Sequence, residues 1–215
     1  MNKITIGFLA AFTLLISGCD WLGIRGNGHI VTDQRSITEF TEIAGSGGLR
    51  IEWHSGPPAL SITTDENLLP YIQDRISGST LRLHTRDRLR PTHGIKVSVS
   101  SPRLNGADLS GAVDLIAQGL SGPKFYVRAS GASDITIDGN VDEFLGDITG
   151  AADVKADKLQ TKITEISSTG ASSAKVSVSD TLRVSITGAG DVTYLGNPKT
   201  IEKHITGAGS IRHKE

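Results

Sequence analysis

The sequence predicts an all-β fold, a single-domain parallel β-helix (β-solenoid) with about nineteen residues per coil. A short motif recurs at nearly constant spacing, apolar and polar residues alternate around each copy, and the composition favours strands. The 215 residues include 25 glycines, 37% hydrophobic residues and only 5% aromatic residues. This composition is typical of one folded domain with many strands and tight turns.

Residues 1–18 are predicted to be a lipoprotein signal peptide. Lys3 supplies the positive start, and residues 4–16 form an apolar run too short to span a bilayer comfortably. The segment "ISGC" that ends at Cys19 resembles the bacterial lipobox, in which the cysteine receives the lipid. Cys19 is the only cysteine, so a disulfide within the chain is impossible and we expect lipidation there. The alternatives are cleavage of an ordinary signal peptide nearby and an uncleaved anchor.

A lipidated Cys19 predicts a bacterial envelope protein whose partner is the membrane, because two or more acyl chains hold a chain firmly on a bilayer. Residues 19–28 would then be a tether. The apolar tether residues Trp21, Leu22 and Ile24 either rest at the membrane surface or begin the packed domain. Asp20 resembles a signal for retention in the inner membrane, which favours a periplasm-facing inner-membrane location over the outer membrane.

Residues 29–215 form the predicted domain, with irregular first coils and an end cap over 29–100 and regular repeats over 101–215. Alternating segments such as "GLRIEW" and "IKVSVS" predict strands in the first part. Gly47 resembles a degenerate copy of the repeated corner. Residues 65–76 are the one plausible helix or turn, with Asp65 as an acidic cap and Pro70 as a breaker.

The regular part repeats the motif [ST]-G-A six times, with 20, 19, 20, 18 and 19 residues between successive glycines. Such a period is typical of solenoids, in which each repeat buries its apolar face against its neighbours. Period-two alternation before and after each glycine predicts a strand entering and a strand leaving a corner, where the alanine suits limited interior room. An antiparallel sandwich is the competing interpretation, but its turns recur every 8–12 residues or so. The glycines are Gly111, Gly131, Gly150, Gly170, Gly188 and Gly207.

The chain resembles the head GIN domain family, whose members are bacterial envelope proteins named as adhesins. The resemblance covers most of residues 37–213 and includes "ITEFTEIAGSGGLRIEW", "TDENLLPYIQDRISGSTLRLHT", "IKVSVSSPRLNGADLSGAVDL" and the repeated corners. It implies a right-handed β-helix, often on a lipoprotein. The family brings no established catalytic residues, so none is transferred to this chain.

A column of carboxylates is the main candidate for site chemistry. Stacked coils would align the residues three positions after each glycine, where serine stands in two repeats. These side chains either cap backbone N–H groups at the corner or hold a weakly bound cation such as calcium. No transition-metal site is expected, because the six histidines lack ligand-like spacing, and no cofactor is expected. The aspartates of this column are Asp114, Asp134, Asp153 and Asp191.

The sequence favours a non-enzymatic scaffold or adhesion and recognition module over an enzyme, because repeated corners give carboxylates nearly identical surroundings. Its ligand would be a protein or a glycan, and the Ser and Thr columns before the glycines are candidate contact surfaces. Binding or processing of an envelope glycan is the alternative function. The net charge of −1 and the predicted compartment argue against nucleic acid. The arginines at 82, 86, 88 and 90 either meet anionic groups or form a solvated hairpin tip.

Overall fold

The computed structural model describes residues 23–214, and almost all of them lie in β-strands or the turns between them. The predicted all-β class is confirmed. The signal peptide, Cys19 and residues 20–22 of the tether lie outside the described residues, so those predictions stay predictions.

Fifteen strands and one 3-10 helix (η1) are present in the described part of the chain, and thirteen of the strands belong to one open, mixed sheet. Strands β1 and β7 form a separate pair. The elements are β1 (Ile24–Arg25), β2 (Ile30–Arg35), β3 (Glu42–Ser55), β4 (Ala59–Asp65), η1 (Glu66–Tyr71), β5 (Ile72–Ser77), β6 (Thr80–Thr85), β7 (Leu89–Arg90), β8 (Lys96–Ser101), β9 (Gly106–Gly131), β10 (Asp134–Gly150), β11 (Asp153–Gly170), β12 (Ser173–Gly188), β13 (Asp191–Leu195), β14 (Thr200–Gly207) and β15 (Ser210–His213).

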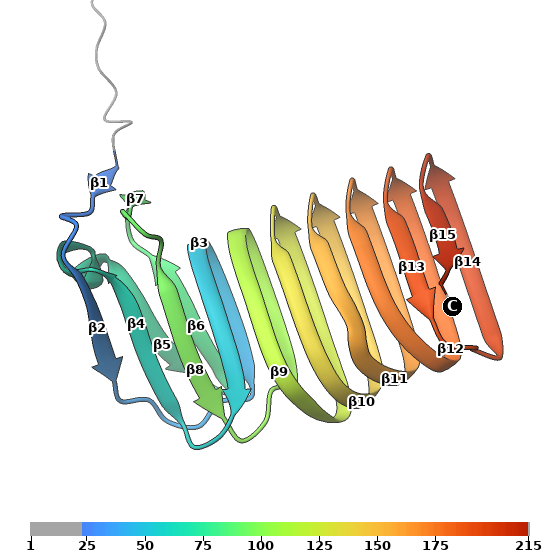
Figure 1. Cartoon of the computed structure of the whole chain (residues 1–215), viewed down its shortest axis with the longest axis horizontal. Coiled ribbons are helices and arrows are strands. Elements are labelled where there is room, and N and C mark those ends of the chain that lie inside the picture. The colour runs from blue at the N-terminus through green and yellow to red at the C-terminus, as the bar shows by residue number, and fades with distance from the viewer. Residues whose placement is uncertain (1–22, 215) are drawn as a thin grey trace, which may run out of the picture.

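The repeated part consists of long strands that pair in parallel with their sequence neighbours. Figure 1 shows β9 to β12 as bent ribbons stacked along the long axis, followed by β13 to β15 at one end of the molecule. The pairing keeps the motif in register, because Gly131 pairs with Gly150, Gly150 with Gly170 and Gly170 with Gly188. Identical letters of the repeat are therefore spatial neighbours.

Each corner needs glycine for two separate reasons. Gly150 has φ +115°, a region that favours glycine, and a Cβ placed there would lie 2.5 Å from the carbonyl oxygen of Gly131. The next residue anchors the corner, since the Ala151 N–H donates to the same Gly131 carbonyl at 2.9 Å. Gly170, Gly188 and Gly207 repeat this geometry on the preceding glycine. The corner thus requires close contact between consecutive backbones.

The alternating apolar residues form the core, as predicted. Leu115, Ile135 and Val154, four residues after their glycines, are almost fully buried, and the rings of Phe125 and Phe144 stack 6.3 Å apart between neighbouring strands. The interpretation of the alanines was wrong. Ala151 and its equivalents are exposed, and the following position, such as Ala152, points into the core instead.

The part before the repeats joins them through β3. This strand pairs in parallel with β9, with Gly47 opposite Gly111 and φ +105° at Gly47, so the predicted degenerate corner is confirmed. Beyond β3 the pattern changes, because β2, β4 and β8 are antiparallel neighbours and so are β5 and β6. This mixed region covers the first end of the stack (Figure 1).

The segment predicted as a helix or turn is a 3-10 helix followed by the strand β5. The interpretation of Asp65 as a helix cap was wrong, since its side chain makes no cap hydrogen bond. Asp65 is fully buried and accepts hydrogen bonds from the Gly28 N–H, the Thr92 N–H and the Thr92 hydroxyl at 2.7–2.9 Å. Burial alone raises the pKa of Asp65, but the hydrogen bonds from Thr92 and Gly28 outweigh it and lower the pKa below its usual value.

A second polar contact holds the same end together. The guanidinium of Arg35 in β2 donates to the carbonyls of Ile72 and Leu69 at 2.9 and 3.2 Å and pairs with Asp33 and Asp74. One side chain thereby ties β2 to η1 and β5. The described end of the tether also packs on the domain, because the Ile24 N–H donates to the Arg88 carbonyl at 2.8 Å.

Candidate functional site

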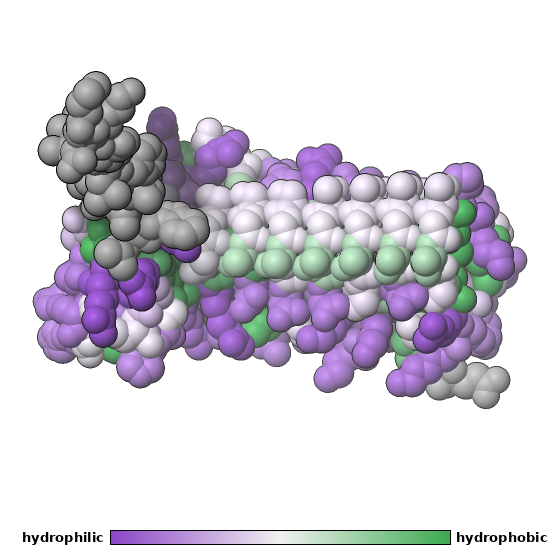
Figure 2. Space-filling model, turned by 90° about the horizontal axis from the view of Figure 1, so that it is seen from above, coloured by the Kyte–Doolittle hydropathy of each residue, from purple (hydrophilic) through white to green (hydrophobic). Residues whose placement is uncertain are grey.

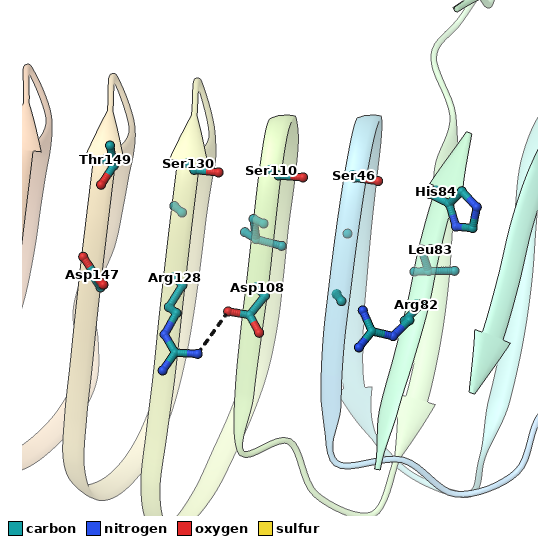
Figure 3. A pocket seen from close by; sticks show the side chains of 14 residues that line it. Ser46, Arg82, Leu83, His84, Asp108, Ser110, Arg128, Ser130, Asp147 and Thr149 are labelled. Carbon is teal, nitrogen blue, oxygen red and sulfur yellow. Dashed lines mark ion pairs between the residues drawn. The ribbon is translucent and has the colours of Figure 1, made fainter. Parts of the chain in front are cut away.

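A groove of about 670 Å³ lies on the outer surface of four neighbouring strands, β6, β3, β9 and β10. Figure 3 shows the side chains that line it, projecting from successive parallel strands. The pairing explains this arrangement, because outward-facing residues at matching positions must form rows across the strands.

The lower row of the groove alternates in charge. Ala44 pairs with Arg82 on one side and with Asp108 on the other, and Asp147 pairs with Arg128. Arg128 and Asp108 lie on two successive passes of the long strand β9 and form an ion pair of 3.7 Å (Figure 3). The small side chain of Ala44 leaves an open floor between Arg82 and Asp108. Arg82 makes no ion pair with any residue of 23–214.

An aromatic side chain stands beside this row. Tyr126 packs on Gly106, where even a Cβ would lie 2.1 Å from the ring, and the Arg128 guanidinium lies over the ring at 5.2 Å from its centroid. Burial raises the pKa of Tyr126, and the carboxylates of Asp108 and Glu42 raise it further. Tyr126 is therefore a neutral, half-buried platform next to the groove.

The upper row of the groove carries hydroxyl groups. Ser46 pairs with Ser110 and also with His84, and Ser130 pairs with Thr149, all labelled in Figure 3. Ser110, Ser130 and Thr149 are members of the predicted Ser and Thr column, which continues through Thr169, Thr187 and Thr206 on later strands. The column is exposed, and Figure 2 shows the corner edge beside it as a flat, regular strip of small residues.

The predicted carboxylate column also comes together. Asp134 pairs with Asp153, Asp153 with Ser173 and Ser173 with Asp191, while Asp114 pairs with Arg50. Ser173 donates to Asp153 and Ser210 donates to Asp191 through their hydroxyls, so serines relieve part of the like-charge contact. No group of three or more His, Cys, Asp or Glu side chains that could hold a metal ion is found within 23–214. Calcium binding and corner capping remain predictions.

The arginines of this group have different surroundings. Arg82 lines the groove, Arg86 donates its backbone N–H to the carbonyl of Tyr71 at the end of η1, and Arg90 pairs with Arg25 in the small β1–β7 sheet. Sequence reasoning missed Asp108, Arg128 and Asp147. Aligning the residues three positions before each glycine would have found them, because this column reads Asp, Arg, Asp, Ser, Ser, His.

A comparison of the sequence with models of known protein families shows which family the chain belongs to. The model of the "Putative auto-transporter adhesin, head GIN domain" family matches residues 39–198, which is most of the chain. The chain belongs to this family. The suspected resemblance is confirmed, and the matched residues include the whole groove but not β14 and β15.

Solved structures share the fold at low identity. A putative adhesin from Bacteroides fragilis has a TM-score of 0.73 at 20% identity and covers 89% of this chain and 100% of its own. A putative lipid binding protein from Parabacteroides distasonis (TM-score 0.55, 24% identity) and a putative adhesin from Parabacteroides merdae (0.52, 21%) each cover 89% of this chain and 99% of their own. Curated proteins give no match. Within residues 23–214 no helix is long and apolar enough to cross a membrane.

Proposed function

We propose that this head GIN protein is a non-enzymatic scaffold or adhesion and recognition module of the bacterial envelope, carried on a right-handed parallel β-helix of about nineteen residues per coil. Glycine corners in register and a spacing of 18 to 20 residues between them support the coil architecture. Membership of a family named as adhesins supports the recognition role.

The groove carries the proposal. The strands β6, β3, β9 and β10 contribute alternating charges, hydroxyls and an open floor at Ala44 to one outer surface. An extended partner lying across the strands would meet fixed donors and acceptors at intervals of about 4.8 Å. Regular spacing on a rigid sheet favours recognition, since little side-chain or loop ordering is needed on binding.

The same geometry argues against catalysis. Acid–base work by carboxylates needs two groups held in different surroundings, usually away from bulk water. Here Asp108 is paired with Arg128, and both side chains are exposed, by 44% and 66%. The groove binds through groups that are already charged and already solvated.

The anchor completes the proposal. A lipid on Cys19 would hold the domain at a membrane surface, with the inner membrane favoured by Asp20. Fractionation of cells that express the wild-type chain or Cys19→Ser tests this. We expect the serine variant to leave the membrane fraction, and its continued presence there would overturn lipid anchoring at Cys19.

Recognition by the groove is tested with full-length protein on beads and isolated envelopes from the native host. Arg82→Glu combined with Arg128→Glu should abolish retention of the beads. Lys155→Glu combined with Lys175→Glu is the matched control, because it makes the same charge change on two exposed strand positions away from the groove. Equal retention of the two double variants, with both folded by circular dichroism, would contradict the proposed site.

Glycan binding is the second candidate, and Tyr126 specifically favours it. A half-buried ring beside arginine and carboxylate side chains is the arrangement that sugar rings and their hydroxyls use for stacking and hydrogen bonding. Tyr126→Phe keeps the ring and Tyr126→Ala removes it. Envelope binding that survives in the first and is lost in the second, and that soluble envelope polysaccharide competes away, would favour glycan over protein as the ligand.

A further inference from the structure

The last coil, formed by β14 and β15, leaves apolar side chains uncovered. All eight residues of β14 are exposed, and Ile201 and Ile205 retain 44% and 38% of their surface. Their partners in β12 are Leu182 and Ile186, which are fully buried. The two isoleucines therefore continue the core columns, the rows of matching apolar positions on successive strands, and stand at the end of those rows.

Between these isoleucines the core column carries a charge. Lys203 pairs with Val184, which pairs with Ile166, and both of these are buried. Nearby ion pairs are made by other side chains, namely Arg183 with Glu202 and Lys199 with Asp180. Lys203 itself makes no ion pair within residues 23–214. An exposed lysine at the end of an apolar column is the feature that a partner must match.

The backbone edge is also open. Strand β14 pairs with β12 and β15 pairs with β13, and among the described strands nothing pairs with their outer sides. A strand edge with unpaired N–H and C=O groups is a template for an added strand. Figure 2 shows apolar and hydrophilic residues side by side at this end of the molecule.

Charge decides the kind of partner. Residues 199–215 contain four lysines and arginines and two glutamates, a net charge of +2. A second copy docking end to end would bring two such surfaces together and oppose like charges at the core column. An acidic partner would be attracted by the positive charge of this end.

We infer that the outer edge of β14 binds an extended segment of another protein, which adds as a further strand with one acidic residue opposite Lys203 and apolar residues opposite Ile201 and Ile205. Main-chain hydrogen bonds would supply affinity, and the apolar, acidic, apolar alternation would supply specificity. This surface lies after the residues matched by the family model, and none of its residues lines the groove.

Two labelled peptides of about ten residues test the inference. In both peptides threonine occupies every second position. The positions between are designed to face Ile201, Lys203 and Ile205, and they read valine–glutamate–valine in one peptide and valine–lysine–valine in the other. Fluorescence anisotropy with the full-length protein should show binding of the glutamate peptide at least about tenfold tighter than the lysine peptide. Binding of neither peptide, or equal binding of both, would overturn the inference.

Charge reversal makes the test specific to the column. Lys203→Glu should reverse the preference, so that the lysine peptide binds tighter. Lys214→Glu makes the same charge change at the same end outside β14 and should keep the original preference. An equal loss in both variants would show attraction by net charge alone and would contradict strand addition. Sedimentation of the wild type supplies a separate check, since self-association abolished by Ile205→Lys would assign the edge to a second copy.

Discussion

The two ends of the stacked strands are finished in different ways. At the first end β2, β4 and η1 cover the core, held by the buried carboxylate of Asp65 and the guanidinium of Arg35. At the other end β14 presents core positions to solvent, so that Ile205 is 38% exposed where its partner Ile186 is fully buried. A repeat is thus stabilised when neighbouring strands cover its apolar side chains on both sides. The first end is stabilised by polar contacts that occur only there.

The largest effect on stability is expected from truncating a core isoleucine. Ile186 and Ile205 occupy the same core column, one inside the stack and one at its end. Ile186→Ala should lower the free energy of unfolding by about 3–4 kcal/mol, because it opens a cavity between two covering strands. Ile205→Ala should cost less than about 1 kcal/mol, because solvent already reaches that site. Urea denaturation of both variants measures the difference, and equal losses would mean that the terminal coil is covered in solution.

A corner glycine should give the next largest effect. Gly150→Ala should cost about 2–3 kcal/mol, since φ is +115° and the new methyl would lie 2.5 Å from the Gly131 carbonyl oxygen. Gly48→Ala is the matched control, because a Cβ there meets nothing within 4 Å and Gly48 does not have a positive φ. A Gly150→Ala variant as stable as the Gly48→Ala variant would show that the corners are not in close contact.

A smaller, pH-dependent effect is expected at the covered end. The pKa of Asp65 is lowered in the folded state, so its ionised form stabilises the fold above the unfolded pKa of about 4, and this contribution is lost as pH falls through the folded value. Asp65→Asn should be less stable than wild type at pH 7. The gap should close on acidification. A gap that is constant down to the acid transition would contradict the hydrogen-bonded carboxylate.

The smallest effect is expected from an exposed ion pair on the repeats. Hydrogen bonding and attraction by Asp142 raise the pKa of Lys162, yet the two side chains are 71% and 55% exposed and 2.7 Å apart. Lys162→Gln should leave the urea midpoint unchanged within error at physiological salt. A clear loss would indicate that outward charge rows, and not only the core columns, hold the strands in register.

These contrasts also explain what the sequence could predict. The repeated sequence around Gly131, Gly150 and Gly170 determines the strand register. Each copy buries its apolar face against the next, and a shift in register would move every apolar side chain out of the core. The antiparallel pairing of β2, β4 and β8 depends on contacts between single, unrepeated segments, which no periodicity reveals. Asp65 was misread for the same reason, since its partners Gly28 and Thr92 are distant in sequence.

The groove lies where the two kinds of region meet. Asp108, Arg128 and Asp147 come from the repeats and their row was readable from the glycine alignment. Arg82 and Ala44 come from β6 and β3, outside the repeats, and join that row only through strand pairing. The hydroxyl column was predicted correctly as exposed, but its role as one side of a groove required the structure.

Distances between spin labels along that hydroxyl column test the central claim, stacking of successive repeats in register, most directly. In a Cys19→Ser background, cysteines at Ser110 and Thr187 are four strand steps apart and cysteines at Ser46 and Thr206 are six. Electron spin resonance should give separations near 19 Å and 29 Å, in proportion to the steps at about 4.8 Å each. Separations that do not grow with the number of steps would contradict the stacking, and the groove and the terminal edge would fall with it.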